Sequence, residues 1–228
     1  MAEWIGVLPD TRVRWGIVFD IDGTLYTNPE YGRASAAREI ELIGEKLVRG
    51  KKETEDLIAS TKEILIRETG SEVTLTQVVS CLQVSFYAWN QIRERAWTPE
   101  KWLKEDAALA GMLWKEWRRN RVSIAFGTNA PRNVGMRTLL ALGIIPDCPI
   151  FGPESFGISK PDKRFFASIA EVLGLDPQQC FCIGDRRFTD VDPAIAAGFS
   201  GGVVVSGRDE LFNLLPNLLN GETDYGSA

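Results

Sequence analysis

The sequence predicts an α/β protein in which helices cover both faces of a parallel sheet, with an all-helical domain inserted into the chain. From about residue 106 onward, short and nearly continuous apolar runs alternate with helical patterns, which is typical of parallel strands buried on both faces. Between about 29 and 105, apolar residues recur at helical spacing and no strand pattern interrupts them. The 228 residues, 44% of them hydrophobic, suffice for a buried core.

The first part of the chain contains one core strand, expected at 16–20, and 12–15 offers a short lead-in strand before it. The inserted segment should hold about four helices. Within it, Thr74 and Gln77 have the spacing of a capping box, in which two side chains satisfy the free N–H groups of a helix start. The expected domain boundaries are 1–28 with 106–228 for the sheet domain and 29–105 for the helical domain.

The remaining elements follow from the alternation of apolar runs and helical patterns. Helices are expected at 106–120, 132–142, 162–173, 193–197 and 209–219, and strands at 122–126, 149–151, 180–183 and 202–205. In open sheets of this kind, ligands bind beyond the carboxyl ends of the strands. The residues that follow each strand are therefore the first candidates for a functional site.

Composition excludes several classes of protein. The net charge of −5 argues against a nucleic-acid partner, and no apolar run is long enough to span a membrane. The N-terminus lacks the basic-then-apolar pattern of a signal peptide, so a cytoplasmic location is expected. The chain has no histidine, which excludes Ser-His-Asp systems and His-ligated zinc. Its four cysteines show no C-x-x-C spacing and are expected to be buried free thiols rather than disulfides or zinc ligands.

The strongest signal lies at the end of the first strand, where Asp20 and Asp22 follow an apolar run and Gly23 follows them. A buried strand that ends in two carboxylates needs a cation, a set of donors or a solvated cleft to offset the cost of desolvation. One acid could then act as a nucleophile and the other as a proton donor. The alternative is an Asp-Gly turn that closes a hairpin, but Thr24 is followed by a loop pattern rather than a second strand.

Polar residues also follow the other strands. Thr128 and Asn129 come after the second core strand, Lys160 after the third, and Asp185 and Asp190 after the fourth. Each has an ordinary structural interpretation: a helix cap for the threonine and the second aspartate, a surface position for the lysine, a turn for the first aspartate. Because these residues fall just beyond three different strands, we interpret them together as one site.

Carboxylates gathered at one edge of a sheet are suited to Mg²⁺, which prefers oxygen ligands. A lysine, a hydroxyl and free backbone N–H groups are suited to an anion. Together with an aspartate nucleophile, these groups indicate phosphoryl transfer through an aspartyl-phosphate.

The order of these motifs resembles that of the haloacid dehalogenase (HAD) superfamily, in its phosphatase branch with a helical, C1-type cap between the first two core strands. Four motifs carry the resemblance: Asp20-Ile21-Asp22-Gly23-Thr24, Thr128, Lys160, and Gly184-Asp185 with Asp190. It covers 13–27 and 106–218, and extends to the cap only in placement and helicity. It implies a Rossmann-like core whose first and fourth strands are neighbours.

For the acids, the resemblance implies specific roles. Asp20 would attack phosphorus, and Asp22 would protonate the leaving oxygen and then deprotonate water. Mg²⁺ would bind the carboxylates of Asp20 and Asp185 and the backbone carbonyl of Asp22. Asp190 would not bind the metal directly but would orient metal-bound water or Lys160.

For the phosphate-binding groups, the resemblance implies that Thr128 and the N–H of Asn129 hold phosphoryl oxygens, while Lys160 offsets negative charge. Dehalogenating members lack an acid at the position of Asp22, so we expect phosphate chemistry: an enzyme that hydrolyses a small phosphorylated metabolite. The Asp-Gly-Thr-Leu-Tyr start is similar to that of nucleotidase-like members. The substrate and the roles of Arg186 and Arg187 remain open, and so does the oligomeric state, with a homodimer among the options.

Two alternatives stay open. A phosphomutase-type phosphotransferase would move the group within one molecule; mutases of this subfamily usually carry an acid soon after the first motif, where this chain has 25–28, Leu-Tyr-Thr-Asn. A degenerate member acting as a binding or regulatory protein is the other, but an idle site has no physical reason to keep several mutually repelling carboxylates.

Overall fold

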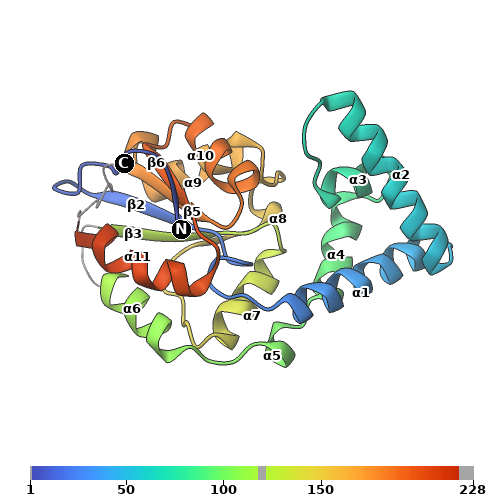
Figure 1. Ribbon diagram of the computed structural model, residues 1–228, viewed down its shortest axis with the longest axis horizontal. Coiled ribbons are helices and arrows are strands. Elements are labelled where there is room, and N and C mark those ends of the chain that lie inside the picture. The colour runs from blue at the N-terminus through green and yellow to red at the C-terminus, as the bar shows by residue number, and fades with distance from the viewer. Residues whose placement is uncertain (1, 118–121, 221–228) are drawn as a thin grey trace. The chain divides into compact units, whose positions relative to one another are not determined.

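The computed structural model describes residues 2–117 and 122–220. The chain divides into two compact units, which Figure 1 shows by residue colour: Met1–Asn28 with Leu103–Ala228, and Pro29–Trp102. The helical segment thus ends three residues before the boundary expected at 105. No helix among the described residues is long and apolar enough to cross a membrane.

Within the larger unit, the described strands form one six-stranded sheet in the order β1-β6-β5-β2-β3-β4. All neighbouring strands are parallel except β1, which runs antiparallel to β6. β2 lies between β5 and β3, so the first and fourth core strands are neighbours, as expected. The strands are β1 (Glu3–Gly6), β2 (Trp15–Phe19), β3 (Val122–Gly127), β4 (Ile150–Phe151), β5 (Cys180–Gly184) and β6 (Gly201–Val204).

The N-terminal edge differs from the expectation. The lead-in strand predicted at 12–15 is not a separate strand: Arg12 pairs with Asp10 in an exposed turn, and Trp15 is already the first, fully buried residue of β2. The strand that precedes β2 is instead β1, at the sheet edge. Because β1 is short and partly exposed, it has no apolar run by which the sequence would reveal it.

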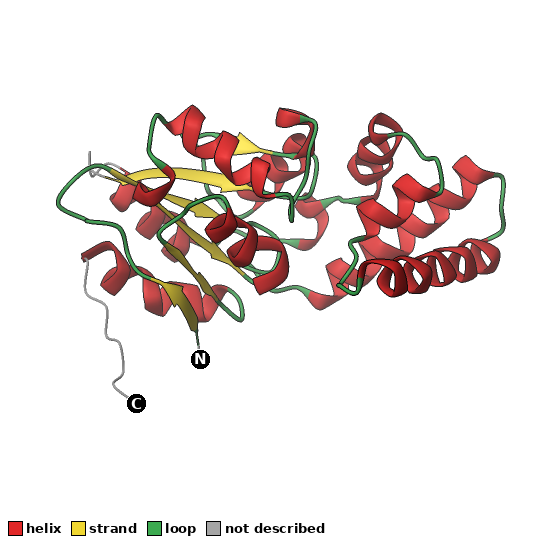
Figure 2. Ribbon diagram, turned by 90° about the horizontal axis from the view of Figure 1, so that it is seen from above, coloured by secondary structure: helices red, strands yellow, loops and turns green. Residues whose placement is uncertain are grey.

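Helices cover both faces of the sheet, as Figure 2 shows for the strands in yellow and the helices in red. On one face, α9 (Lys163–Leu173) packs Phe165 and Ile169 against Val18 of β2 and Ala125 of β3. Six α-helices accompany the described strands: α6 (Ala107–Trp117), α7 (Arg132–Ala141), α8 (Pro153–Phe156), α9 (Lys163–Leu173), α10 (Asp192–Ala196) and α11 (Arg208–Asn220). Two further single turns are η1 (Pro177–Gln179) and η2 (Arg187–Val191). The last residues of the helix expected at 106–120 lie outside the described residues.

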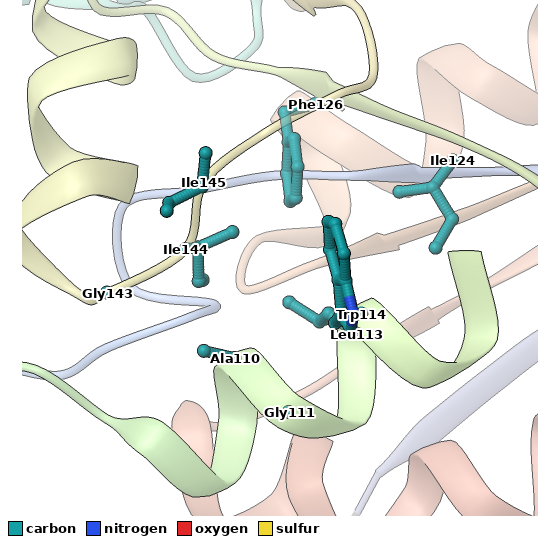
Figure 3. A pocket seen from close by; sticks show the side chains of 9 residues that line it. All are labelled: Ala110, Gly111, Leu113, Trp114, Ile124, Phe126, Gly143, Ile144 and Ile145. Carbon is teal, nitrogen blue, oxygen red and sulfur yellow. The ribbon is translucent and has the colours of Figure 1, made fainter. Parts of the chain in front are cut away.

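On the other face, α6 leaves an apolar hollow of about 280 Å³ against β3, with Trp114 of α6 and Phe126 of β3 facing it (Figure 3). The loop after α7 closes its rim with Ile144 and Ile145. None of the candidate site residues lines this hollow. It belongs to the packing of α6 on the sheet and not to the predicted reaction site.

The smaller unit, all of whose residues the structure describes, contains helices and no strand. Its five helices are α1 (Pro29–Leu47), α2 (Lys51–Thr69), α3 (Leu75–Cys81), α4 (Phe86–Ala96) and α5 (Pro99–Trp102). The expected number was about four, and the additional one is the single turn of α5. The capping box is confirmed: Thr74 accepts from the N–H of Gln77, whose side chain accepts from the N–H of Thr74.

A buried ion pair joins α1 and α4 in the helical unit. Glu39 accepts from Arg93 Nε at 3.1 Å and from Trp97 Nε1 at 2.6 Å. The guanidinium of Arg93 also lies over the rings of Trp89 and Trp97. Because both charged side chains are about nine-tenths buried or more, each depends on the other for compensation.

Glu39→Ala should therefore destabilise the helical unit by about 3 kcal/mol, since it leaves the buried Arg93 charge without its carboxylate. Chemical denaturation followed by circular dichroism measures this loss. Glu41→Ala is the matched control on the same helix, where the pair with Arg38 is exposed and should contribute little to stability. Equal losses in the two variants would show that the buried pair contributes no more to the free energy of unfolding than the exposed pair does.

Candidate active site

Asp20 and Asp22 lie at the carboxyl end of β2, on a tight turn. The N–H of Asp20 still bonds the carbonyl of Ile183 in β5, so it continues the ladder of the sheet. The chain then turns, with a bond from Leu25 N–H to the Ile21 carbonyl. The hairpin alternative is wrong, because no second strand follows; Asp22 and Tyr26 form only an isolated bridge.

Gly23 allows this turn for two reasons. Its φ is +94°, a conformation that residues with a Cβ rarely adopt. A Cβ at this position would also collide with the carboxylate of Asp185, which comes from the end of β5. The glycine therefore permits the close approach of two acid-bearing strand ends.

Gly23→Ala should destabilise the sheet unit by at least about 2 kcal/mol and sharply reduce activity, because it strains φ and pushes Asp185 away. Thermal unfolding and the assay described below measure the two effects. Gly32→Ala is the matched control: it lies in α1 with open space around it, and it should be neutral or slightly stabilising. A fully stable and active Gly23→Ala would contradict this account of the turn.

Lys160 is the centre of the buried part of the site. Its ammonium donates to Asp20 Oδ1 at 2.6 Å and to Asp190 Oδ1 at 2.5 Å, and its side chain is 2% exposed. The interpretation as an ordinary surface lysine is therefore wrong. Burial lowers the pKa of Lys160, but the carboxylates of Asp190 and Asp20 together outweigh it and raise the pKa above its usual value, which favours the charged lysine.

Burial raises the pKa of Asp20 from 3.8 to about 7; Lys160 opposes this shift, and the carboxylates of Asp190, Asp185 and Asp22 add to it. Burial also raises the pKa of Asp185. The site therefore holds more negative charge than Lys160 alone balances. A further cation close to Asp20 and Asp185 would favour their ionised forms.

Asp22 is held separately from the lysine. Its Oδ2 accepts from Thr128 Oγ1 at 3.1 Å, and its Oδ1 accepts from Tyr26 Oη at 2.7 Å. The hydroxyl of Thr128 thus lies beside Asp22, whereas the resemblance implied that it holds a phosphoryl oxygen. A contact of Tyr26 with Asp22 was not predicted from the sequence. The feature that could have indicated it is the turn at Gly23, which brings two residues four positions apart in sequence together.

Asn129 contributes through its side chain. Its Oδ1 accepts from the N–H of Lys160 at 2.9 Å, and its Nδ2 donates to the Lys160 carbonyl at 3.1 Å. Thr128 is fixed in turn by the N–H of Ala130, which donates to its hydroxyl at 2.9 Å. The loop after β3 therefore clamps the backbone of the lysine loop, a contact that the sequence did not predict. Thr24 is a second unpredicted contact; its hydroxyl donates to Asp20 Oδ2 at 2.9 Å.

A metal ion fits these residues. Oxygens of Asp20, Asp185 and Asp190 lie within 4.8 Å of one another, and the described residues offer no other group of this kind. Both carboxylate oxygens of Asp190 already accept hydrogen bonds, Oδ1 from the Lys160 ammonium and Oδ2 from the N–H of Arg186 at 3.1 Å. Asp185 Oδ1, in contrast, is buried without a hydrogen bond, although Arg186 Nε forms an ion pair with it at 3.5 Å. An oxygen of this kind, beside a second carboxylate, suits a hard cation such as Mg²⁺.

The two arginines after Asp185 differ in direction. Arg186 Nε lies 3.5 Å from Asp185 Oδ1, so this arginine faces the acid group. Arg187 turns away and pairs with Glu3 and Asp192. Of these two arginines, Arg186 is therefore the one that adds positive charge beside Asp185.

The chain matches the family model of the haloacid dehalogenase-like hydrolases over residues 16–198. It belongs to this family. A comparison of this HAD-like hydrolase with curated proteins found no match. Its sheet and motifs agree with that assignment, and the four predicted motifs all lie at the carboxyl ends of the strands.

Solved structures share the HAD fold at low sequence identity. A HAD phosphatase from Thermococcus onnurineus is 20% identical with a TM-score of 0.53, over 81% of this chain and 83% of that one. A hydrolase from Pseudomonas syringae is 18% identical with a TM-score of 0.53, over 90% and 99%. A β-phosphoglucomutase from Clostridium difficile is 17% identical with a TM-score of 0.53, over 91% and 98%. Since their chemistries differ, these likenesses establish the fold and leave the reaction to be argued from the site.

Proposed function

We propose that this HAD-family protein is a Mg²⁺-dependent phosphatase that hydrolyses a small phosphomonoester through an aspartyl-phosphate. The observation that supports this most is the position of Asp22. A second acid lies beside the buried Asp20–Lys160 pair and is held by two hydroxyl groups. Replacement of a halide needs no proton for the leaving group, whereas the departure of an alkoxide from phosphorus does.

In the first step, Asp20 forms a bond to phosphorus while the bond to the leaving oxygen breaks. Asp22 gives its proton to that oxygen. In the second step, water bonds to phosphorus, Asp22 accepts the water proton, and Asp20 is released. Lys160 holds Asp20 in place for the attack, because its ammonium donates to one oxygen of that carboxylate.

Mg²⁺ would be held by Asp20, Asp185 and the backbone carbonyl of Asp22. When bound, it would offset the negative charge that a phosphate dianion brings toward four aspartates. Thr128 and the N–H of Asn129 would hold phosphoryl oxygens, and Asp190 would keep Lys160 in position. The helical unit, Pro29–Trp102, would act as the cap that selects the substrate.

The test is phosphate release from a panel of phosphomonoesters that includes nucleoside monophosphates, sugar phosphates, glycerol phosphate and p-nitrophenyl phosphate. Each is assayed with Mg²⁺ and with a chelator. We expect release that depends on Mg²⁺ and is greatest for one class of ester. A phosphorylated isomer that forms without free phosphate would favour a phosphomutase instead. No reaction with any ester, in protein shown to be folded, would contradict the proposal.

A further inference from the structure

The contact between Tyr26 and Asp22 is built into the fold of the turn. Tyr26 is 9% exposed, and its hydroxyl lies 2.7 Å from Asp22 Oδ1. The bond from Leu25 N–H to the Ile21 carbonyl closes the turn, and the bridge between Asp22 and Tyr26 aligns their backbones. The phenol is therefore fixed beside the acid by the backbone as well as by its own burial.

The second hydroxyl that donates to Asp22, that of Thr128, is also expected to bind phosphate. A threonine hydroxyl carries one hydrogen, and in the structure Thr128 gives it to Asp22 Oδ2. If Thr128 binds a phosphoryl oxygen, as the proposed function requires, this hydrogen leaves Asp22. Among the side-chain hydrogen bonds to Asp22 in the described part of the chain, that from Tyr26 would then remain.

We propose that Tyr26 is a positioning residue for Asp22. Its hydroxyl donates to Oδ1, so the proton that Asp22 exchanges resides on Oδ2, the oxygen that Thr128 releases. This inference rests on the proposed phosphatase function. In the first step, the Asp20–phosphorus bond forms, the bond from phosphorus to the leaving oxygen breaks, and the proton on Asp22 Oδ2 passes to that oxygen. Without the phenol hydroxyl, the carboxyl group is free to rotate away from this position.

The consequence depends on the leaving group. An alkoxide is a strong base and needs the proton of Asp22 as it departs, whereas p-nitrophenolate is a weak base and leaves without it. Loss of the Tyr26 hydroxyl should therefore slow the first step for alkyl phosphates and spare it for p-nitrophenyl phosphate. A general loss of folded structure would slow both substrates equally.

The experiment compares kcat/KM for the best alkyl phosphate of the panel with kcat/KM for p-nitrophenyl phosphate in Tyr26→Phe. We expect the ratio of the two values to fall by about 10- to 100-fold from that of the unmodified protein. The ratio does not depend on how much of the variant is folded, because both substrates use the same active fraction. Thr138→Val, which removes a buried hydroxyl of α7 outside the site, should leave the ratio unchanged.

Asp22→Asn separates this inference from the proposed function on which it rests. It should lower the same ratio by more than Tyr26→Phe does. If Asp22→Asn lowers the ratio and Tyr26→Phe does not, the positioning role of Tyr26 is wrong while the phosphatase mechanism stands. If neither variant changes the ratio, Asp22 is not the general acid and the proposed mechanism fails as well.

Discussion

Asp20→Asn should abolish phosphate release, with a loss of at least about 10⁴-fold, because an amide cannot form the bond to phosphorus that the proposed mechanism needs. The protein should remain folded. Burial raises the pKa of Asp20 to about 7, so an ionised carboxylate at this position costs folding free energy that a neutral amide does not.

Phosphate release at substrate saturation, together with thermal unfolding, measures both effects. Asp209→Asn is the matched control, since this aspartate is almost fully exposed on α11 and should leave both quantities unchanged. A stable Asp20→Asn that retains more than about one-hundredth of the activity would remove Asp20 from the role of nucleophile.

Lys160→Met should be the most destabilising of the substitutions considered, with a loss of about 3–5 kcal/mol, and it should also abolish activity. Methionine keeps the length of the side chain but leaves the buried carboxylates of Asp20 and Asp190 facing each other without a cation. For the sheet unit, this corresponds to a fall in Tm of about 10 °C. Lys163→Met, at the exposed start of α9, is the control and should change neither quantity.

The deficit of Lys160→Met should also depend on pH. An acid whose folded pKa lies above its unfolded value binds more protons in the folded state, so stability falls as pH rises between the two values. For Asp20 the pKa is already raised from 3.8 to about 7 with the lysine present. The unmodified protein shares this loss up to about pH 7. Without the lysine the pKa of Asp20 rises further, so the extra deficit of the variant should grow as the pH rises above about 7. A deficit that is constant with pH would mean that lost packing, rather than uncompensated charge, causes it.

The sequence was most informative where apolar runs end in polar residues. Strand β5 was expected at 180–183 and spans Cys180–Gly184, and the candidate residues lie in the segments that follow the strands of one sheet, although α8 intervenes between β4 and Lys160. Parallel strands buried on both faces leave a strong pattern, and their shared direction brings their carboxyl ends together. This is why acids more than 160 residues apart, Asp20 and Asp185, could be assigned to one site before their positions were known.

The contacts within the site were not predictable in the same way. The side chain of Asn129 clamps the backbone of Lys160 through pairing across two loops, which has no periodic pattern in sequence. Tyr26 reaches Asp22 only because Gly23 adopts a positive φ. The edge strand β1 was not predicted for a related reason, since a short and partly exposed strand has no clear run of apolar residues.

In the proposed mechanism, Asp20 carries the phosphoryl group during turnover. The most direct measurement is to quench the protein with acid during turnover of its best ester and treat it with borohydride, which reduces an acyl phosphate to the alcohol. Peptide mass spectrometry then reads position 20. We expect homoserine at position 20, dependent on substrate and absent from Asp20→Asn. Rapid turnover with Asp20 recovered unmodified, or with the reduced residue at another position, would contradict it.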